Sequence, residues 1–190
     1  SRDGYIPKLS FSDHQFCEHC QYGKQVAASH PTSTPRESSP LDLVHSNVCG
    51  PMPHQSLGGA SYFVSFIDKS TQKVWAYPIR TKDWVFSIFS EWLAMVKNQT
   101  GRKLKCLQTD NGGEFKYEEF INFCRERGIR REYTASYIPE QNGIAECMNQ
   151  TIQEHVVSML QHSGLSDGFC PEALLTTLHI INMSPSRPLR

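Results

Sequence analysis

The sequence lacks a long apolar run, a leader-like beginning and an excess of charge of either sign. No stretch reaches the ~18 consecutive apolar residues of a membrane-spanning helix, and the N-terminus has no basic segment followed by an apolar one. Lys and Arg together number 19, as do Asp and Glu, so the formal net charge is zero. Because nucleic-acid-binding domains usually carry a basic excess, the overall charge does not indicate nucleic acid as a partner.

The cysteines also exclude one class of protein. There are seven, an odd number, and they are scattered through predicted strands and helices, which favours reduced thiols in an intracellular protein over a disulfide framework. We interpret Cys49, Cys106 and Cys124 as core packing residues. The 190 residues suffice for one globular domain with additional segments. Since the chain starts with Ser1 and not Met, we expect it to be a fragment of a longer polypeptide.

The chain divides at a segment that is rich in proline and hydroxyl residues. Residues 30–40, "HPTSTPRESSP", contain three prolines and five Ser or Thr residues, which predicts an extended linker. Residues 1–29 are expected to form a separate N-terminal piece and residues 41–185 the main domain. Residues 186–190 are interpreted as the start of a C-terminal extension.

Regular patterns fill the main domain. Aromatic and β-branched runs predict strands over residues 41–49, 60–68, 73–79, 103–110 and 129–134. Apolar residues at helical spacing predict helices over residues 81–101, 117–128, 144–164 and 166–185, with a loop over 136–143. Three strands, then a helix, a strand, a helix, a strand and two helices predict an α/β fold. We expect an RNase H-like mixed five-stranded sheet flanked by helices.

Two acidic residues occupy positions where α/β folds place active sites. Asp110 ends the fourth predicted strand before the turn "NGG", and Glu146 lies in the first turn of the helix predicted to begin at Ile144. Asn47 lies near the end of the first strand, which we expect beside the fourth. Because active-site groups gather at strand ends, the three could converge. The alternatives are a turn aspartate and a glutamate that complements a helix dipole.

The helix that carries Glu146 has two faces at 100° per residue. The predicted polar face consists of Glu146, Asn149, Gln150 and Gln153. The opposite, apolar face consists of Ala145, Met148, Ile152, Val156 and Met159. Glu146 therefore points away from the apolar stripe, toward solvent or a cleft.

Five stretches of the sequence, taken together, resemble a known family. These are "LDLVHSNVCGPM", "SYFVSFID", "CLQTDNGGEF", "IPEQNGIAE" and "MNQTI", and 35 residues separate Asp110 from Glu146. They resemble the integrase of copia-type LTR retrotransposons, the catalytic core of a retrovirus-related Pol polyprotein. The resemblance implies an RNase H-like core in which three carboxylates hold two Mg²⁺ or Mn²⁺ ions. It also implies DNA 3′-end processing and strand transfer.

The resemblance further implies partners and a location. The partners would be the DNA ends of the element, target DNA and further copies of the same chain, with no membrane. The location would be the nucleus, reached through a cytoplasmic virus-like particle. The resemblance suggests DNA contacts from Tyr137 and Gln141 in the loop and from Asn149, Gln150 and Gln153 on the helix.

One member of the expected acidic triad is missing. Asp110 and Glu146 match the family pattern, which then assigns them as metal ligands, but Asn47 stands where the pattern has Asp. An amide has the shape of a carboxylate, carries no charge, and offers only one coordinating head atom. Asp42 is no substitute, because an odd offset along a strand points to the opposite face. We therefore predict an enzyme that is weak or inactive, or an inert integrase-fold relic or co-opted binding module.

Several arginines of the family pattern are also replaced. The affected positions are Trp84, Gln108, Cys147, Gln150 and His155. Each change, like Asp to Asn, can arise from a single C→T or G→A mutation, so we hypothesise a decayed copy of an element. The alternative is natural variation at these positions.

A possible zinc site lies near the N-terminus. Cys17 and Cys20 form a CxxC that resembles half of the family's His-His-Cys-Cys zinc site. Zn²⁺ would bind only with upstream histidines, because His14 and His19 crowd the same loop. The alternative is two reduced surface thiols.

Basic residues gather in two segments of the main domain. They could contact DNA phosphates, or they could be solvated ends balanced by glutamates. The basic residues are Lys97, Arg102, Lys103, Lys105, Arg125, Arg127, Arg130 and Arg131.

Overall fold

The computed structural model describes residues 39–52, 55–133 and 139–184 of the chain. The predicted N-terminal piece with Cys17 and Cys20, almost all of the predicted linker, Tyr137 and the predicted C-terminal extension lie outside these residues. In the part of the chain that the structure describes, no helix is long and apolar enough to cross a membrane.

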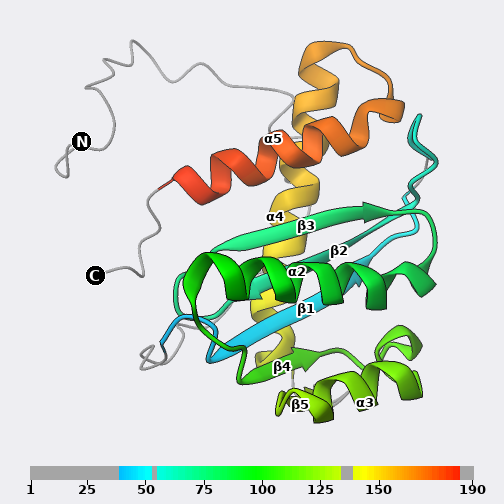
Figure 1. The fold of residues 1–190 in the computed structure, drawn as a ribbon. Helices are drawn as coiled ribbons and strands as arrows, with labels where there is room; N and C mark the ends of the chain where they lie inside the picture. The colour runs from blue at the N-terminus through cyan, green and yellow to red at the C-terminus, as the bar shows by residue number, and fades with distance from the viewer. Residues whose placement is uncertain (1–38, 53–54, 134–138, 185–190) are drawn as a thin grey trace, which may run out of the picture.

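A mixed five-stranded sheet forms the centre of the domain (Figure 1). Its strands are β1 (Leu43–Cys49), β2 (Tyr62–Asp68), β3 (Val74–Ile79), β4 (Cys106–Thr109) and β5 (Arg130–Tyr133). Their order in the sheet is β3-β2-β1-β4-β5. The pairs β1–β2 and β2–β3 are antiparallel, and the pairs β1–β4 and β4–β5 are parallel. The predicted RNase H-like sheet is thus confirmed, with β1 at its centre.

Helices cover both faces of the sheet, so the domain has three layers (Figure 1). The helices are α2 (Val85–Thr100), α3 (Glu118–Glu126), α4 (Pro139–Ser163) and α5 (Cys170–Met183). Short 3-10 turns cover Lys82–Trp84, Gly113–Phe115 and Asp167–Phe169. Helices α2 and α3 pack on one face, and α4 and α5 pack on the other.

Aromatic rings dominate the core between the sheet and α2. Phe66 of β2 stacks on Trp92 of α2 with ring centroids 4.5 Å apart, and Trp75 of β3 meets Trp92 edge-on at 5.6 Å. Phe89 stacks on Phe120 of α3 at 4.8 Å and so joins the two helices. Offset and edge-on aromatic pairs add to the stabilisation that burial alone gives. Both tryptophans therefore pack in this core.

The hairpin beside β1 is organised by one buried carboxylate. Asp68, at the end of β2, is 1% exposed. Its carboxylate accepts hydrogen bonds from the backbone N–H of Leu41 and of Thr71, each at 2.8 Å, and from the hydroxyls of Ser70 and Thr71. A carboxylate with this many donors is well compensated for its burial. Asp68 therefore fixes the β2–β3 turn against the start of β1.

Three predicted helix starts are wrong, and one of them is that of α5, which was expected at residue 166 and begins at Cys170 after a 3-10 turn. Helix α4 begins at Pro139, inside the predicted loop 136–143, because a proline at the first helical position sacrifices no hydrogen bond. Gly143 costs about 1 kcal/mol in a helix interior, and it did not prevent the helix from extending through it. Thr81, the predicted helix start, instead precedes the 3-10 turn Lys82–Trp84 and makes no side-chain capping hydrogen bond. Helix α2 itself begins at Val85. Its predicted end is confirmed, since Gly101 adopts a left-handed φ of 66° there.

Candidate active site

Asn47, near the end of β1, and Asp110, directly after β4, lie side by side on adjacent parallel strands. Ser46 of β1 pairs with Thr109 of β4, so Asn47 and Asp110 are the next residues along each strand. Side chains alternate along a strand. Val48 packs in the α2 core and Cys49 in the α4 core. Asn47 and Asp110 therefore face the layer of α4, and the expected placement of the first strand beside the fourth is confirmed.

Helix α4 brings Glu146 to the same face. In Figure 1 the helix crosses behind the sheet, with its N-terminal half behind β1 and β4. Gln153, two turns after Glu146 on the same side of the helix, donates from Nε2 to Sγ of Cys49 at 2.8 Å, which fixes α4 over the end of β1. Glu146 is exposed and is the eighth residue of α4. The predicted position in the first turn is wrong, and so is the alternative that it complements a helix N-terminus.

The carboxylate of Asp110 has a raised pKa because it is partly buried and has other acids nearby. Burial raises its pKa most strongly, and the negative charges of Glu114 and Glu146 raise it further. Two effects oppose them: Oδ1 of Asp110 accepts a hydrogen bond from the backbone N–H of Gly112 at 3.0 Å, and Lys82 lies nearby. Asp110 is thus also a turn residue, as the alternative proposed. The charge of Glu146 contributes to the raised pKa of Asp110, so the two carboxylates lie on the same side of the sheet and near one another.

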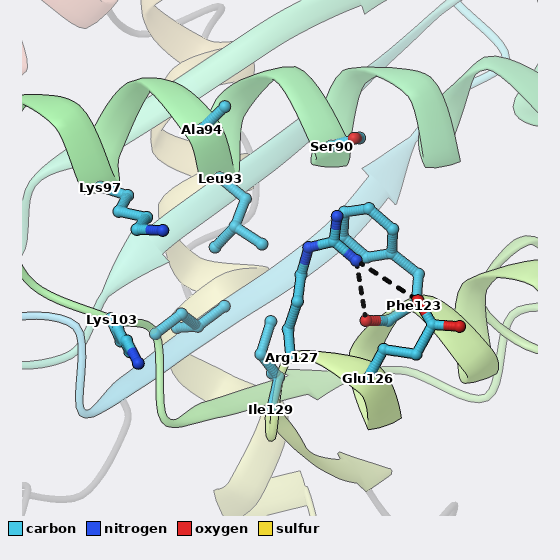
Figure 2. Close-up of a pocket in the computed structure, with 10 residues that line it drawn as sticks. Ser90, Leu93, Ala94, Lys97, Lys103, Phe123, Glu126, Arg127 and Ile129 are labelled. Carbon is cyan, nitrogen blue, oxygen red and sulfur yellow. Dashed lines mark hydrogen bonds and ion pairs between the residues drawn. The ribbon is translucent and has the colours of Figure 1, made fainter.

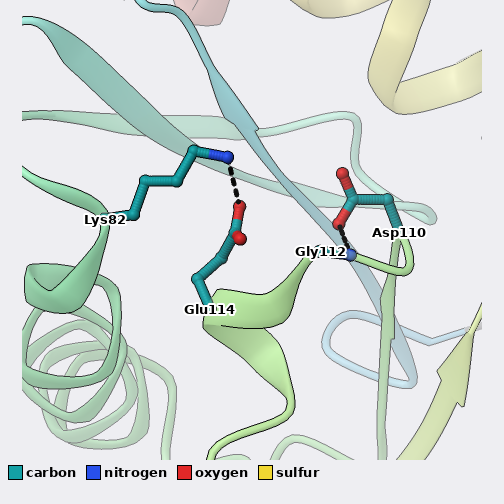
Figure 3. A network of polar contacts seen from close by, with 4 residues as sticks. All are labelled: Lys82, Asp110, Gly112 and Glu114. Carbon is teal, nitrogen blue, oxygen red and sulfur yellow. Dashed lines mark hydrogen bonds and ion pairs between the residues drawn. The ribbon is translucent and has the colours of Figure 1, made fainter.

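A third carboxylate lies beside Asp110, and sequence reasoning did not assign it a role. Glu114 has a side chain that is 5% exposed, and its Oε1 lies 3.2 Å from Nζ of Lys82 (Figure 3). A Cβ placed on Gly112 would come within 2.9 Å of Oδ1 of Asp110 and 2.8 Å of Oε2 of Glu114. The two carboxylates therefore flank Gly112. The motif "TDNGGE" contained this signal, because its glycines permit so tight a turn.

The residues predicted to contact DNA on α4 lie in different environments. Asn149 is 5% exposed, and in the described part of the chain its amide atoms have no hydrogen-bond partner. Gln150 is half-buried and donates to Glu154 at 3.1 Å, whereas Gln153 is exposed. Of the predicted polar face, Glu146 and Gln153 are thus exposed, whereas Asn149 is buried. Asn149 lies three residues after Glu146 in α4, and this offset turns its side chain toward the sheet. The side chain of Gln141 falls outside the described residues.

The apolar face of α4 is as predicted. Ala145 and Ile152 are fully buried, Val156 is 6% exposed, and Met148 and Met159 are partly buried against the same core. Because this stripe is held by the sheet, the orientation of α4 about its axis is fixed. Glu146 is consequently held at the solvent-facing edge of the site.

Asn47 adds an uncharged side chain to this site. It is half-buried, and its backbone oxygen accepts a hydrogen bond from Oγ of Ser65 at 3.3 Å. Asp42 pairs with Lys105 at 2.7 Å just before β1 begins, so it does not substitute for Asn47. Within residues 39–52, 55–133 and 139–184, no three His, Cys, Asp or Glu side chains are grouped to hold a metal ion.

The basic residues lie mainly on the other side of the sheet. Figure 2 shows a pocket of about 400 Å³ between α2 and α3, lined in part by Lys97, Lys103 and Arg127. The guanidinium of Arg127 lies 3.5 Å from the ring centroid of Phe123 and pairs with Glu126 at 3.8 Å. This pocket is separated from Asp110 by the sheet.

Other members of the basic group also have internal partners. Arg130 pairs with Glu132 at 2.9 Å. Arg131 packs on the ring of Phe120 at 4.8 Å and donates to the backbone carbonyl of Phe115. Arg131 is thus held inside the domain, whereas Arg127 and Arg130 form exposed ion pairs with nearby glutamates, which matches the interpretation of balanced strand and helix ends.

Comparisons with known proteins identify relatives of this architecture. No family model matches the chain. It is 49% identical over 173 residues, 91% of its length, to the retrovirus-related Pol polyprotein from transposon TNT 1-94 of Nicotiana tabacum. The chain spans only 13% of the length of that polyprotein.

A solved structure has the same fold. It is a chain in the structure of the simian T-cell lymphotropic virus intasome in complex with the PP2A regulatory subunit B56 gamma. The TM-score is 0.58 at 18% identity, and the match covers 84% of this chain and 61% of that chain. At this identity the likeness establishes the fold alone.

Proposed function

This chain belongs to the copia-type retrotransposon integrases, as the core of a retrovirus-related Pol polyprotein, and we propose that it is a polynucleotidyl transferase core weakened by Asn47. Its ancestral reaction would be DNA 3′-end processing followed by strand transfer. The observation that supports this best is the adjacency of positions 47 and 110 at the ends of β1 and β4, with Glu146 brought to the same face by α4.

The residues present suit a divalent cation. Asp110 and Glu146 supply anionic oxygens, the ligands that Mg²⁺ and Mn²⁺ prefer. Burial raises the pKa of Asp110 most, and the negative charges of Glu114 and Glu146 raise it further, so a bound cation would relieve repulsion between these carboxylates. When bound, two such ions activate an attacking oxygen and stabilise the leaving one at a phosphodiester. Asp110 and Glu146 are the residues that would hold them.

Asn47 determines how well the chain can bind these ions. A carboxylate at this position would add a negative charge between Asp110 and the neighbouring strand β2. The amide supplies one neutral oxygen at best. We therefore expect weaker cation binding and little strand transfer in this chain.

DNA is the proposed substrate and partner. The half-buried and exposed amides of Gln150 and Gln153 lie on the α4 surface that continues from Glu146, where they can donate to a phosphodiester backbone. Tyr137 and Gln141, which precede them in the sequence, are proposed to contact the same DNA. Assembly with further copies of the chain and action in the nucleus belong to the same proposal. A Zn²⁺ ion at Cys17 and Cys20 would require histidines from an upstream segment.

A non-catalytic module is the second candidate. Two observations favour it: the amide at position 47, and the internal pairing of Arg127, Arg130 and Arg131 in a chain without net charge. Such a module would keep the integrase fold and use its surfaces for binding without chemistry.

A strand-transfer assay with Mg²⁺ or Mn²⁺ separates the two candidates. The samples are the unaltered protein, Asn47→Asp, and Asn47→Asp combined with Asp110→Asn as the control without a functional site. We expect little product from the unaltered protein, more from Asn47→Asp, and none from the double variant. Full activity in the unaltered protein would contradict the role given to Asn47. Equal inactivity in all three samples would support the non-catalytic module.

A further inference from the structure

We propose that Glu114 is a positioning residue for Asp110 and that Lys82 is an internal counter-cation of the same acidic site. The inference rests on the proposed function, since it concerns how the site binds a divalent cation. Neither residue is part of the expected triad. Figure 3 shows the carboxylate of Glu114 between the ammonium group of Lys82 and the turn that carries Asp110.

The turn that carries Asp110 is built around Gly112. Oδ1 of Asp110 accepts from the N–H of Gly112, and a Cβ on the same glycine would lie only 2.8 Å from Oε2 of Glu114. The two carboxylates are thus held on either side of one residue, with no room for a side chain between them. A displacement of Glu114 would move the Gly112 backbone and, with it, the hydrogen bond that orients Asp110.

The Lys82–Glu114 ion pair joins a buried charge to an exposed one. The side chain of Glu114 is 5% exposed, whereas that of Lys82 is 48% exposed. A buried carboxylate without a partner costs several kcal/mol, so Lys82 stabilises Glu114 in the protein without a cation. Lys82 is free to move outward because half of its side chain is in solvent. The ammonium group of Lys82 can therefore move away from Glu114 when a divalent cation adds positive charge to the site.

The two residues are thus expected to affect cation binding in opposite directions. Glu114 adds negative charge and fixes the orientation of Asp110, so its removal weakens binding. Lys82 adds positive charge to the same site, so its removal strengthens binding. A purely structural ion pair behaves differently, because loss of either partner lowers thermal stability and leaves cation affinity unchanged.

The test is Mn²⁺ titration, followed by the electron paramagnetic resonance signal of free Mn²⁺. It uses the unaltered protein and the variants Glu114→Gln, Glu114→Asp, Lys82→Gln and, as the variant without the central ligand, Asp110→Asn. The matched control is Asp83→Asn, which removes an exposed carboxylate next to Lys82. The same set is prepared with Asn47→Asp, in which we expect tighter binding. The melting temperature without Mn²⁺ is recorded for each variant.

Residues that support metal ligands from outside typically contribute about 10–100-fold in affinity, so we expect Glu114→Gln to weaken Mn²⁺ binding by about tenfold or more. Glu114→Asp keeps the charge but shortens the reach to Lys82 and Gly112. Its Mn²⁺ affinity should therefore lie between those of the unaltered protein and Glu114→Gln. Lys82→Gln should tighten binding severalfold, and Asp83→Asn should stay within about twofold of the unaltered protein.

Two results would overturn the inference and leave the proposed function intact. One is unchanged Mn²⁺ affinity in Glu114→Gln while Asp110→Asn abolishes binding. The other is a shift in the same direction for Glu114→Gln and Lys82→Gln. Absence of Mn²⁺ binding in both the unaltered and the Asn47→Asp protein would instead contradict the proposed metal site, and the inference with it.

Discussion

Asn47 and Asp110 occupy equivalent positions at the ends of adjacent parallel strands, each one residue past the pair Ser46–Thr109. Both face α4, the helix that carries Glu146. An aspartate at position 47 would therefore enter a site that already holds carboxylates. The first prediction follows from this crowding.

Asn47→Asp should lower the melting temperature without a divalent cation, because it adds a like charge beside Asp110 and Glu146. Addition of Mn²⁺ should raise the melting temperature of Asn47→Asp more than that of the unaltered protein, since a ligand that binds only the folded state stabilises it. Thermal denaturation at several Mn²⁺ concentrations measures both effects. Equal Mn²⁺-induced shifts in the two proteins would show that position 47 does not contact the cation site.

Gly112→Ala should destabilise the protein by about 1–3 kcal/mol, the usual cost of an inserted methyl group in a tightly packed place. Its Cβ would lie 2.7–2.9 Å from carboxylate atoms of Glu114 and Asp110. Gly113→Ala is the matched control, because a Cβ there would have nothing within 4 Å. Urea denaturation of both variants gives the comparison. Equal stability of the two would show that the turn adapts without cost.

Asp68→Asn should destabilise the fold by about 2 kcal/mol, because an amide can accept at only one of its two head atoms where the carboxylate uses both. The carboxylate accepts from two backbone N–H groups and two hydroxyls around the β2–β3 turn. Asp83→Asn, at an exposed position on the domain surface, should change stability little. If both variants had the same urea midpoint, the contribution of this network would be negligible.

His45 should make stability depend on pH below neutrality. It is 3% exposed on β1, and burial is the main reason that its pKa falls from 6.5 to about 4, followed by the charge of Lys69. Above pH 6.5 His45 is neutral in both the folded and the unfolded state, and its full contribution to the free energy of unfolding is present. Between pH 6.5 and 4 only the unfolded chain binds the proton, so stability falls as pH falls, by about 3 kcal/mol over the window.

His45→Leu should flatten this part of the stability curve. His179→Leu, which removes an exposed histidine of α5, should leave the curve unchanged. Urea denaturation at half-unit pH steps from 7 to 4 measures the difference between the variants. A slope as steep in His45→Leu as in the unaltered protein would assign the pH dependence to other groups.

The sequence predicted the sheet because its strands are aromatic and β-branched runs with clear turns between them. Asp110 was predictable for the same reason, since it ends such a run immediately before a glycine turn. The start of α4 at Pro139 was not predictable, because local turn residues argued against a helix that its packing against the sheet supports.

Glu114 and Asn149 show a second limit of sequence reasoning. Helical periodicity places Asn149 near Glu146 but cannot decide where the sheet covers that face, and Asn149 proved to be 5% exposed. Glu114 was present in the motif "TDNGGE", but its pairing with Lys82 joins positions 32 residues apart. Only the packing of the Lys82–Trp84 turn beside the Gly113–Phe115 turn brings them together.

The most direct test of the central claim is the anomalous scattering of Mn²⁺ in crystals of the unaltered protein and of Asn47→Asp, soaked under the same conditions. We expect at most one ion between Asp110 and Glu146 in the unaltered protein. In Asn47→Asp we expect two ions, about 3.5–4 Å apart as in two-metal phosphoryl-transfer sites. Two well-ordered ions in the unaltered protein would contradict the claim that Asn47 weakens this site.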